Sequence, residues 1–269
     1  MKLTTPLICA MMVCNCLASS EMGKAKLQWQ TVSTSYQAGQ PLQTAISMDL
    51  EEGWHTYWEN PGDAGMRMKI LWELPAGWRA GELQYPAPSR FTTSGLTSFG
   101  YKDEVVFPII LHPPADAKGT VELKAKVSWL VCNEDSCLPG SASIILNLTS
   151  GPPVVSDSVA MIQASLKKVP QQRANDLTLN VQEGKKELHL TLEVKDAANF
   201  QLLDYEVFPA TPEVIGGAAS YDWVFNEGLR LWQATVPKSE YRSSPVTELA
   251  LVFLGQNGQV PFRVNWKIK

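Results

Sequence analysis

Two cysteines, Cys132 and Cys137, are the residues of this chain whose type and spacing best suit chemistry. They lie in the stretch Trp-Leu-Val-Cys-Asn-Glu-Asp-Ser-Cys-Leu-Pro-Gly, which begins at Trp129. An alternating run over residues 121–131 predicts a strand that leads into the first cysteine, and a second strand is expected after the Pro-Gly pair. The two thiols therefore flank the tip of a predicted hairpin, within bridging distance of each other and within reach of another protein.

Three kinds of chemistry are open to this pair. A structural disulfide is the common use in exported proteins, yet closing so short a loop stabilises a fold by only about 2 kcal/mol, against roughly 4–5 kcal/mol for a very long loop. Short, exposed disulfides are more often the labile ones that exchange with other thiols. Two thiolates could also hold a soft ion such as Cu(I), although no histidine stands beside them in the sequence. No other metal site and no cofactor are predicted.

Residues 1–20 predict export. Lys2 supplies a positive charge, residues 7–17 are almost entirely apolar, and small residues follow at the expected cleavage point. A lipoprotein anchor on Cys14 or Cys16 is the alternative, but the residues before each of these cysteines do not fit the usual pattern for such an anchor. We therefore expect a periplasmic protein from which the signal peptide has been removed.

The leader changes the meaning of the cysteine count. Of the five cysteines, Cys9, Cys14 and Cys16 lie in the predicted signal peptide, so the mature chain keeps only Cys132 and Cys137. An even pair in an oxidising compartment is expected to form a disulfide.

Charge argues against one class of partner, and hydropathy argues against a membrane-spanning segment. The formal net charge is −4 and no cluster of Lys or Arg is present, which argues against binding to nucleic acid. The apolar leader is shorter than the roughly 20 residues that a membrane-spanning helix needs, and no later segment reaches that length. We therefore expect no transmembrane span.

Short alternating runs separated by turn residues predict an all-β protein made of two β-sandwich domains. The first domain is expected over 21–150 and the second over 175–269. The expected strands cover residues 42–50, 68–73, 105–111, 121–131 and 142–148 in the first domain, and 177–181, 187–194, 229–236, 249–254 and 260–268 in the second. The Trp-rich stretch that contains Trp54 and Trp58 is expected to be a loop.

A linker over 151–174 is expected to join the two domains. Within it, residues 156–168 carry Val159, Ile162 and Leu166 at near-helical spacing, which predicts a short helix. Ser156 or Asp157 is expected to cap its N-terminus.

The cysteine stretch resembles the N-terminal periplasmic domain of the DsbD thiol:disulfide interchange proteins, and is similar above all to their ScsB (suppressor of copper sensitivity) branch. Three further segments carry the resemblance: Gly-Trp-His-Thr-Tyr-Trp-Glu-Asn-Pro-Gly-Asp-Ala-Gly from Gly53, Trp-Glu-Leu-Pro-Ala-Gly from Trp72 with Tyr-Pro-Ala-Pro from Tyr85, and Phe-Gly-Tyr-Lys-Asp-Glu-Val-Val-Phe-Pro from Phe99. The resemblance covers residues 25–150. The second half is similar, through weaker motifs, to the additional immunoglobulin-like domain of that branch.

This resemblance implies an immunoglobulin-like sandwich that carries a redox hairpin. It implies that Cys137 forms the mixed disulfide with a partner and that Cys132 resolves it. It also implies an aromatic cap loop over the cysteines, for which Phe91, Phe99 and Tyr101 are the candidates. Tyr101 is the candidate that we expect to be an ordinary core residue.

The resemblance also implies the partners. A membrane thiol transporter domain would supply electrons, and periplasmic thioredoxin-fold proteins with oxidised cysteines would receive them. Copper tolerance and cytochrome c biogenesis are the associated processes. The printed sequence ends at Lys269 without a transmembrane block or a Cys-x-x-Cys domain, so we expect the electron donor to be a separate protein.

Overall fold

A computed structural model of the chain describes residues 20–93, 95–195, 200–256 and 258–268. The predicted signal peptide therefore lies outside the described residues, apart from Ser20. Strands in four sheets form the described part of the chain, which confirms the all-β fold class. No helix in this part is both long enough and apolar enough to cross a bilayer.

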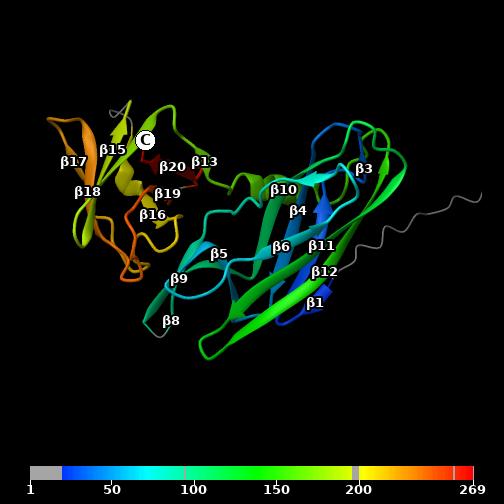
Figure 1. Ribbon diagram of the computed structural model, residues 1–269, viewed down its shortest axis with the longest axis horizontal. Coiled ribbons are helices and arrows are strands. Elements are labelled where there is room, and N and C mark those ends of the chain that lie inside the picture. The colour runs from blue at the N-terminus through cyan, green and yellow to red at the C-terminus, as the bar shows by residue number, and fades with distance from the viewer. Residues whose placement is uncertain (1–19, 94, 196–199, 257, 269) are drawn as a thin grey trace, which may run out of the picture.

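The first sandwich packs two sheets around one core (Figure 1). One sheet has the order β1-β2-β4-β10-β7, and the other has the order β3-β12-β11-β5-β9-β8 with β6 also paired to β11. The bounds are β1 Ser20–Met22, β2 Ala25–Thr31, β3 Ser35–Tyr36, β4 Leu42–Leu50, β5 His55–Gly62, β6 Lys69–Glu73, β7 Arg79–Ala80, β8 Ser89–Thr93, β9 Leu96–Lys102, β10 Glu104–His112, β11 Thr120–Cys132 and β12 Cys137–Ser150.

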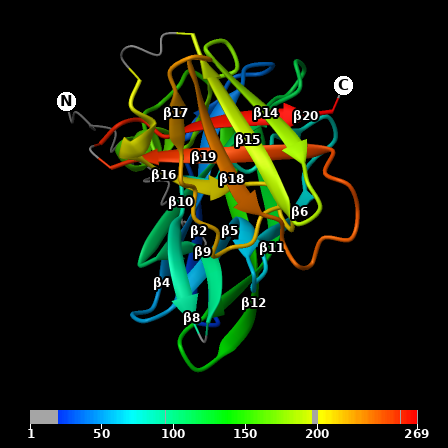
Figure 2. The same ribbon diagram turned by 90° about the vertical axis from the view of Figure 1, so that its left-hand side faces the viewer.

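The second sandwich is smaller and consists of two four-stranded sheets, ordered β13-β20-β19-β16 and β14-β15-β18-β17. Figure 2 views the molecule from the side of this sandwich. The bounds are β13 Gln171–Gln172, β14 Leu177–Glu183, β15 Glu187–Val194, β16 Tyr205–Pro209, β17 Val224–Asn226, β18 Leu231–Pro237, β19 Glu248–Gly255 and β20 Phe262–Lys267, with the 3-10 helix η2 at Leu202–Asp204.

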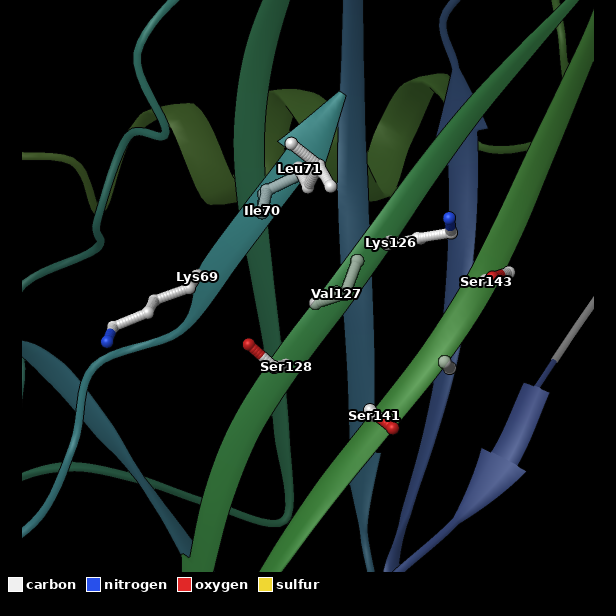
Figure 3. A pocket seen from close by; sticks show the side chains of 9 residues that line it. Lys69, Ile70, Leu71, Lys126, Val127, Ser128, Ser141 and Ser143 are labelled. Carbon is white, nitrogen blue, oxygen red and sulfur yellow. The ribbon is translucent and has the colours of Figure 1, made fainter. Parts of the chain in front are cut away.

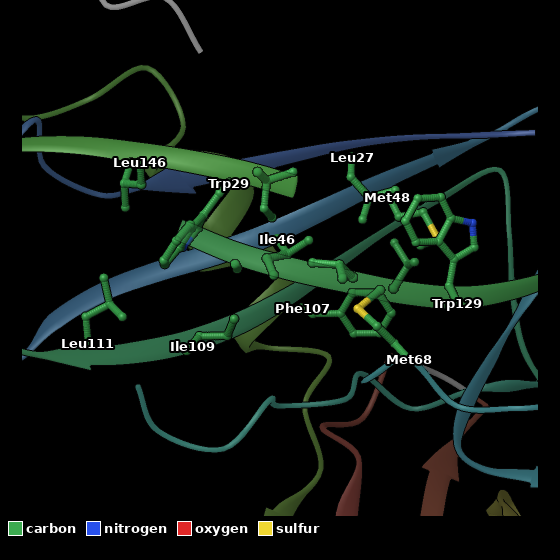
Figure 4. Packing of buried hydrophobic residues seen from close by; sticks show 14 of the residues in the cluster. Leu27, Trp29, Ile46, Met48, Met68, Phe107, Ile109, Leu111, Trp129 and Leu146 are labelled. Atoms are coloured by element: carbon green, nitrogen blue, oxygen red, sulfur yellow. The ribbon is translucent and has the colours of Figure 1, made fainter. Parts of the chain in front are cut away.

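Alternation of apolar and polar residues explains how the first core forms. Along β11, the residues from Leu123 to Val131 are buried at every second position, while the positions between them are polar or partly exposed. Successive side chains on a strand point to opposite faces of the sheet, so one face of β11 enters the core and the other faces outward. Figure 4 shows Trp129 from this strand packed with Met48, Met68 and Phe107 between the sheets.

One expectation for this region is wrong. The Trp-rich stretch predicted as a loop contains strand β5, and Trp58 is fully buried. Four consecutive residues, from His55 to Trp58, are buried, because β5 is covered on both of its faces. A strand buried on both faces shows no alternation of apolar and polar residues, which is the pattern by which strands are identified in a sequence.

The predicted linker helix is α1, Val159–Leu166, and it packs on the first sandwich. Ile162 is fully buried against Ala45 and Val106. The cap prediction is wrong: Ser158 occupies the N-cap and makes no side-chain capping bond. The Ser156 hydroxyl instead accepts the Ser158 N–H at 3.2 Å and donates to the carbonyl of Thr31, which ties the start of the helix to β2.

The two sandwiches share buried contacts. Phe208 on β16 is fully buried and belongs to the core cluster of the first sandwich. Its ring meets Trp58 edge-on at 6.2 Å and Phe99 edge-on at 5.6 Å, between ring centroids. Glu59 and Arg263 form an ion pair of 2.6 Å across the same junction. The second sandwich is therefore docked on β5, which pairs with β11 of the cysteine hairpin, and on β9, which pairs with β5.

We expect Phe208→Ala to lower the free energy of unfolding by about 3–5 kcal/mol, because it removes a fully buried ring from the junction and leaves a cavity. Urea denaturation followed by Trp fluorescence measures this change. Leu203→Ala is the control, since Leu203 is 65% exposed, and its effect should stay within about 0.5 kcal/mol. A loss below about 1 kcal/mol for Phe208→Ala would show that the junction is not a packed core.

Candidate functional site

The cysteines close the tip of the β11–β12 hairpin. The two strands pair in continuous register from Thr120 opposite Thr149 to Cys132 opposite Cys137. The cysteines form the expected disulfide, with their Cα atoms 4.1 Å apart. Directly opposed residues of an antiparallel pair project to the same face, so the register alone brings the two sulfur atoms together.

The turn beyond the disulfide is organised by one side chain. The Asn133 Oδ1 accepts the backbone N–H of Asp135 at 3.0 Å and that of Ser136 at 2.8 Å. The Asn133 N–H in turn donates to the carbonyl of Ser136 at 2.9 Å. An Asn side chain that bonds to nearby backbone in this way stabilises a tight turn. Glu134 and Asp135 are exposed at the tip, so the hairpin presents a polar end to solvent.

The two cysteines differ in exposure. Cys132 occupies an outward-facing position of β11 but is only 3% exposed, whereas Cys137 is exposed. Strand β5 causes the difference, because it pairs with the end of β11 and sets His55 directly opposite Cys132. Opposed side chains lie on the same face, so the imidazole lies beside Cys132 on that face.

Tyr57, two residues further along β5, provides a polar contact to the buried sulfur. Its hydroxyl donates to the Sγ of Cys132 at 2.8 Å. Gly65 holds the Tyr57 ring from behind: its φ is +119°, and a Cβ at this position would lie 2.2 Å from the ring. Only glycine combines this backbone conformation with so close an approach. The chain after β5 thus fixes the direction of the Tyr57 hydroxyl.

Burial sets the protonation of both side chains on β5. Burial lowers the pKa of His55, and the nearby positive charge of Lys102 lowers it further, so the imidazole is neutral at neutral pH. Burial raises the pKa of Tyr57, so its hydroxyl remains protonated and available as a donor. Cys132 therefore lies against a neutral ring and one fixed hydrogen-bond donor.

The three cap candidates occupy two different faces of the β8–β9 hairpin. Phe91 is opposed to Ser98, and its ring lies 5.1 Å from the His55 ring, between centroids. Phe99 is fully buried against Phe208. Because Phe91 pairs with Ser98, it lies on the face opposite to that of the neighbouring Phe99.

Tyr101 shares the inward face of β9 with Phe99. It is buried, its ring packs on Phe107, and its hydroxyl donates to the carbonyl of Pro86 at 2.7 Å. Of the three aromatic candidates, only Phe91 lies on the face that holds the ring of His55.

His55 and Tyr57 are the site residues that sequence reasoning missed as parts of the site. Both lie within a stretch expected to be a loop, and in a loop the side chains of residues two positions apart need not point in the same direction. As a strand, the same stretch places the two side chains on one face. The sequence signal that could have identified them is the spacing of His55 and Tyr57, since two polar aromatic residues two positions apart share one face of a strand.

A groove of about 520 Å³ lies elsewhere on the hairpin (Figure 3). It runs over the outward face of β6, β11 and β12, and its lining includes Leu71, Lys126 and Ser141 but neither cysteine. Within the described part of the chain, no three or more His, Cys, Asp or Glu side chains are grouped closely enough to hold a metal ion.

Comparison with known proteins relates the first sandwich to a family. Residues 25–149 match the family described as thiol:disulfide interchange protein DsbD, N-terminal. This match confirms the resemblance predicted from the motifs. No curated protein matches the sequence.

Solved structures extend the likeness to the whole fold. The N-terminal periplasmic domain of ScsB from Proteus mirabilis superposes with a TM-score of 0.69 at 21% identity, covering 94% of this chain and 97% of that chain. The similarity to ScsB is thus confirmed at the level of the fold. Spo0M, a sporulation control protein from Bacillus subtilis, covers 91% of each chain at 10% identity but has a TM-score of only 0.25.

We expect the buried His55 to make stability depend on pH. Its pKa is lowered in the folded protein, so on acidification the unfolded chain takes up the proton first, near its ordinary pKa of about 6.5. The folded state is therefore destabilised as the pH falls from about 7 towards about 5.5. Urea denaturation at several pH values measures this loss.

The variant His55→Gln is needed to isolate the contribution of His55, because Glu59 changes the stability in the opposite direction. Burial raises the pKa of Glu59, although the neighbouring Arg263 lowers it. The free energy of unfolding should fall less on acidification in His55→Gln than in the wild type. The control variant is His189→Gln, which changes an exposed residue, and its free energy of unfolding should fall as much as that of the wild type. Identical pH slopes for all three proteins would contradict a buried neutral imidazole.

Proposed function

We propose, from the relationship of residues 25–149 to the N-terminal domain of DsbD, that the Cys132–Cys137 pair exchanges its disulfide with the thiols of partner proteins in the periplasm. The observation that carries the proposal is the inequality of the two sulfurs. Cys137 is exposed, while Cys132 is buried and accepts a hydrogen bond from Tyr57. An exchanging pair needs one sulfur that a partner can reach. Its second sulfur must act as the leaving group when the disulfide is reduced and must attack the mixed disulfide when it forms again.

The oxidised pair would be reduced in two steps. A thiolate of the electron donor attacks the Sγ of Cys137, a new S–S bond joins donor and Cys137, and the bond to Cys132 breaks. The electron pair of the broken bond stays on Cys132 as a thiolate, which the Tyr57 hydroxyl stabilises as a donor. A second thiolate of the donor then attacks the donor sulfur of the mixed disulfide. Cys137 is released as a thiolate, and the donor keeps the new disulfide.

The reduced pair would pass its electrons on by the same chemistry. The Cys137 thiolate attacks the disulfide of an oxidised partner and forms a mixed disulfide, and the first partner thiolate is released. Cys132, which stays beside Cys137 because of the strand register, then attacks Cys137 and releases the second partner thiolate. The Cys132–Cys137 disulfide forms again, and the partner gains two electrons.

A purely structural role explains less of the site. The hairpin is already closed by the continuous pairing of β11 with β12 and by the turn bonds of Asn133. A bridge across a loop this short adds only about 2 kcal/mol in the chain-entropy model. It also does not account for a hydroxyl directed at only one of the two sulfurs.

The proposed partners are a membrane thiol transporter domain as the donor and thioredoxin-fold proteins as the acceptors. The family relationship supports this choice, and so does the shape of the site, because a hairpin tip with an exposed Cys137 can enter the active-site groove of another protein. No observation on the described residues favours Cu(I) over exchange, since the two sulfurs are bonded to each other.

Trapping tests the function and the roles together. With a purified thioredoxin-fold protein in its oxidised form, we expect reduced Cys132→Ser to accumulate a mixed disulfide, because Cys137 can attack but nothing resolves the adduct. Reduced Cys137→Ser should accumulate little adduct, since Cys132 is only 3% exposed. Non-reducing electrophoresis and mass spectrometry measure the adducts.

The wild-type protein provides the control for this experiment: in reduced form it should reduce the partner's disulfide without accumulating an adduct. An adduct on Cys137→Ser alone would reverse the assigned roles. If the wild type transfers no electrons and neither variant forms an adduct, the disulfide is an inert bridge.

We further expect Tyr57→Phe to slow reduction of the disulfide by dithiothreitol about tenfold, because the departing Cys132 thiolate loses a hydrogen-bond donor. Stopped-flow measurement of the pseudo-first-order rate at one fixed excess of dithiothreitol gives the comparison. Tyr36→Phe is the matched control: the hydroxyl it removes donates to Gly119 at the opposite end of the hairpin, and the rate should be unchanged. Equal rates for Tyr57→Phe and the wild type would exclude leaving-group stabilisation by Tyr57.

A further inference from the structure

Strand β8 joins the redox site to the second sandwich through two neighbouring residues. Phe91 lies against His55, and Arg90 is opposed to the inward-facing Phe99. Consecutive side chains of a strand point to opposite faces, so β8 presents Phe91 to the site and Arg90 to the second sandwich. Figures 1 and 2 show the β8–β9 hairpin next to β16.

Among the described residues, the hydrogen bonds of the Arg90 guanidinium all go to the second sandwich. Its Nη1 donates to the carbonyl of Gly217, its Nη2 to the carbonyl of Val207 at 3.2 Å, and its Nε to a carboxylate oxygen of Glu206 at 3.3 Å. The guanidinium carbon also lies 5.1 Å from the ring centroid of Phe99 and 5.4 Å from that of Phe208. A planar fork that binds three acceptors while it packs on rings can be provided by Arg but not by Lys.

Asp63 gives the same hairpin a second connection to the second sandwich. Its carboxylate accepts the N–H of Thr97 on β9 at 3.0 Å and the N–H of Gly217 at 2.9 Å. Its own N–H donates to the carbonyl of Thr97 at 2.8 Å. Arg90 and Asp63 therefore both bind Gly217, so each strand of the hairpin is tied to one loop of the second sandwich.

The opposite face of the hairpin covers the region of the buried sulfur. The Phe91 ring lies over His55, and the Lys102 ammonium lies 4.9 Å from the centroid of the Phe91 ring. His55 is the strand partner of Cys132. Movement of β8 away from the sheet would remove Phe91 from this ring and open a path to Cys132.

We infer that Arg90 is a positioning residue, through which the second sandwich braces the β8–β9 hairpin and thereby holds Phe91 over His55 and the buried Cys132. The inference deepens the proposed function and rests on it for its biological meaning, since the brace would limit which thiols reach Cys132. Without its guanidinium bonds, β8 keeps its backbone ladder to β9 but loses these hydrogen bonds to the second sandwich, and it is the edge strand of its sheet. Edge strands that lack such covering contacts open more readily.

The experiment measures access to Cys132 without any exchange reaction. In the reduced protein with Cys137→Ser, iodoacetamide alkylates Cys132, and mass spectrometry follows the rate. We expect Arg90→Ala to raise this rate on the order of tenfold and Arg90→Lys to raise it by a smaller factor, because Lys keeps the charge but cannot form the fork.

Arg263→Ala is the matched control, because it breaks the Glu59 ion pair of the same junction without touching the hairpin. It should leave the alkylation rate unchanged. The NMR signals of the His55 ring protons give an independent readout, since they lie near the Phe91 ring. The chemical shifts of these signals should change in Arg90→Ala and remain unchanged in Arg263→Ala. The free energy of unfolding of both variants is measured in urea alongside.

Two results would overturn the inference. One is an unchanged alkylation rate in Arg90→Ala, and the other is an equal acceleration in Arg263→Ala, which would indicate general loosening of the junction. The alkylation and NMR results do not depend on partner proteins. If they come out as expected while the trapping experiment fails, the brace stands and the proposed exchange function falls.

Discussion

The pairing of β11 between β5 and β12 is the constraint on which the site depends. This register places Cys137 opposite Cys132 on one side and His55 opposite Cys132 on the other. Side chains alternate with a period of two, so a slip by one residue would move Cys132 to the core face and bring Val131 outward. The apolar side chains of β11 that fill the core prevent that slip, with Trp129 fully buried among them. Packing of the core therefore determines where the sulfurs lie.

The same alternation makes the two sulfurs chemically unequal. An outward-facing residue on a sheet is usually exposed, as Cys137 is. Cys132 is buried only because β5 continues the sheet beside the end of β11, and its side chains lean over the sulfur. Tyr57 then supplies one donor to this sulfur. The difference in exposure between Cys132 and Cys137 thus follows from the neighbour that β11 has at this point and that β12 lacks.

Much of this arrangement could be predicted from the sequence, and the limit has a physical reason. The hairpin, its paired cysteines and the all-β fold follow from alternation and turn residues, which are local signals. His55 and Tyr57 were not predicted as site residues, because β5 is buried on both faces and lacks such alternation. The separation of Phe91 from Phe99 and Tyr101 also could not be predicted, because the faces of a hairpin depend on its register. The contacts of Arg90 link residues more than a hundred positions apart, for which a single sequence holds no local signal.

The junction between the sandwiches gives the second one a physical connection to the site. Phe208 enters the first core and meets Trp58 and Phe99. These two residues lie on the inward faces of β5 and β9, and the outward faces of the same strands carry Tyr57 and Lys102. A strand transmits a displacement from one face to the other because its backbone is shared, and a close-packed core permits little movement. The second sandwich therefore bears on β5, which lies beside Cys132, and on β9, which pairs with β5, and this favours a role in shaping the site over that of a passive spacer.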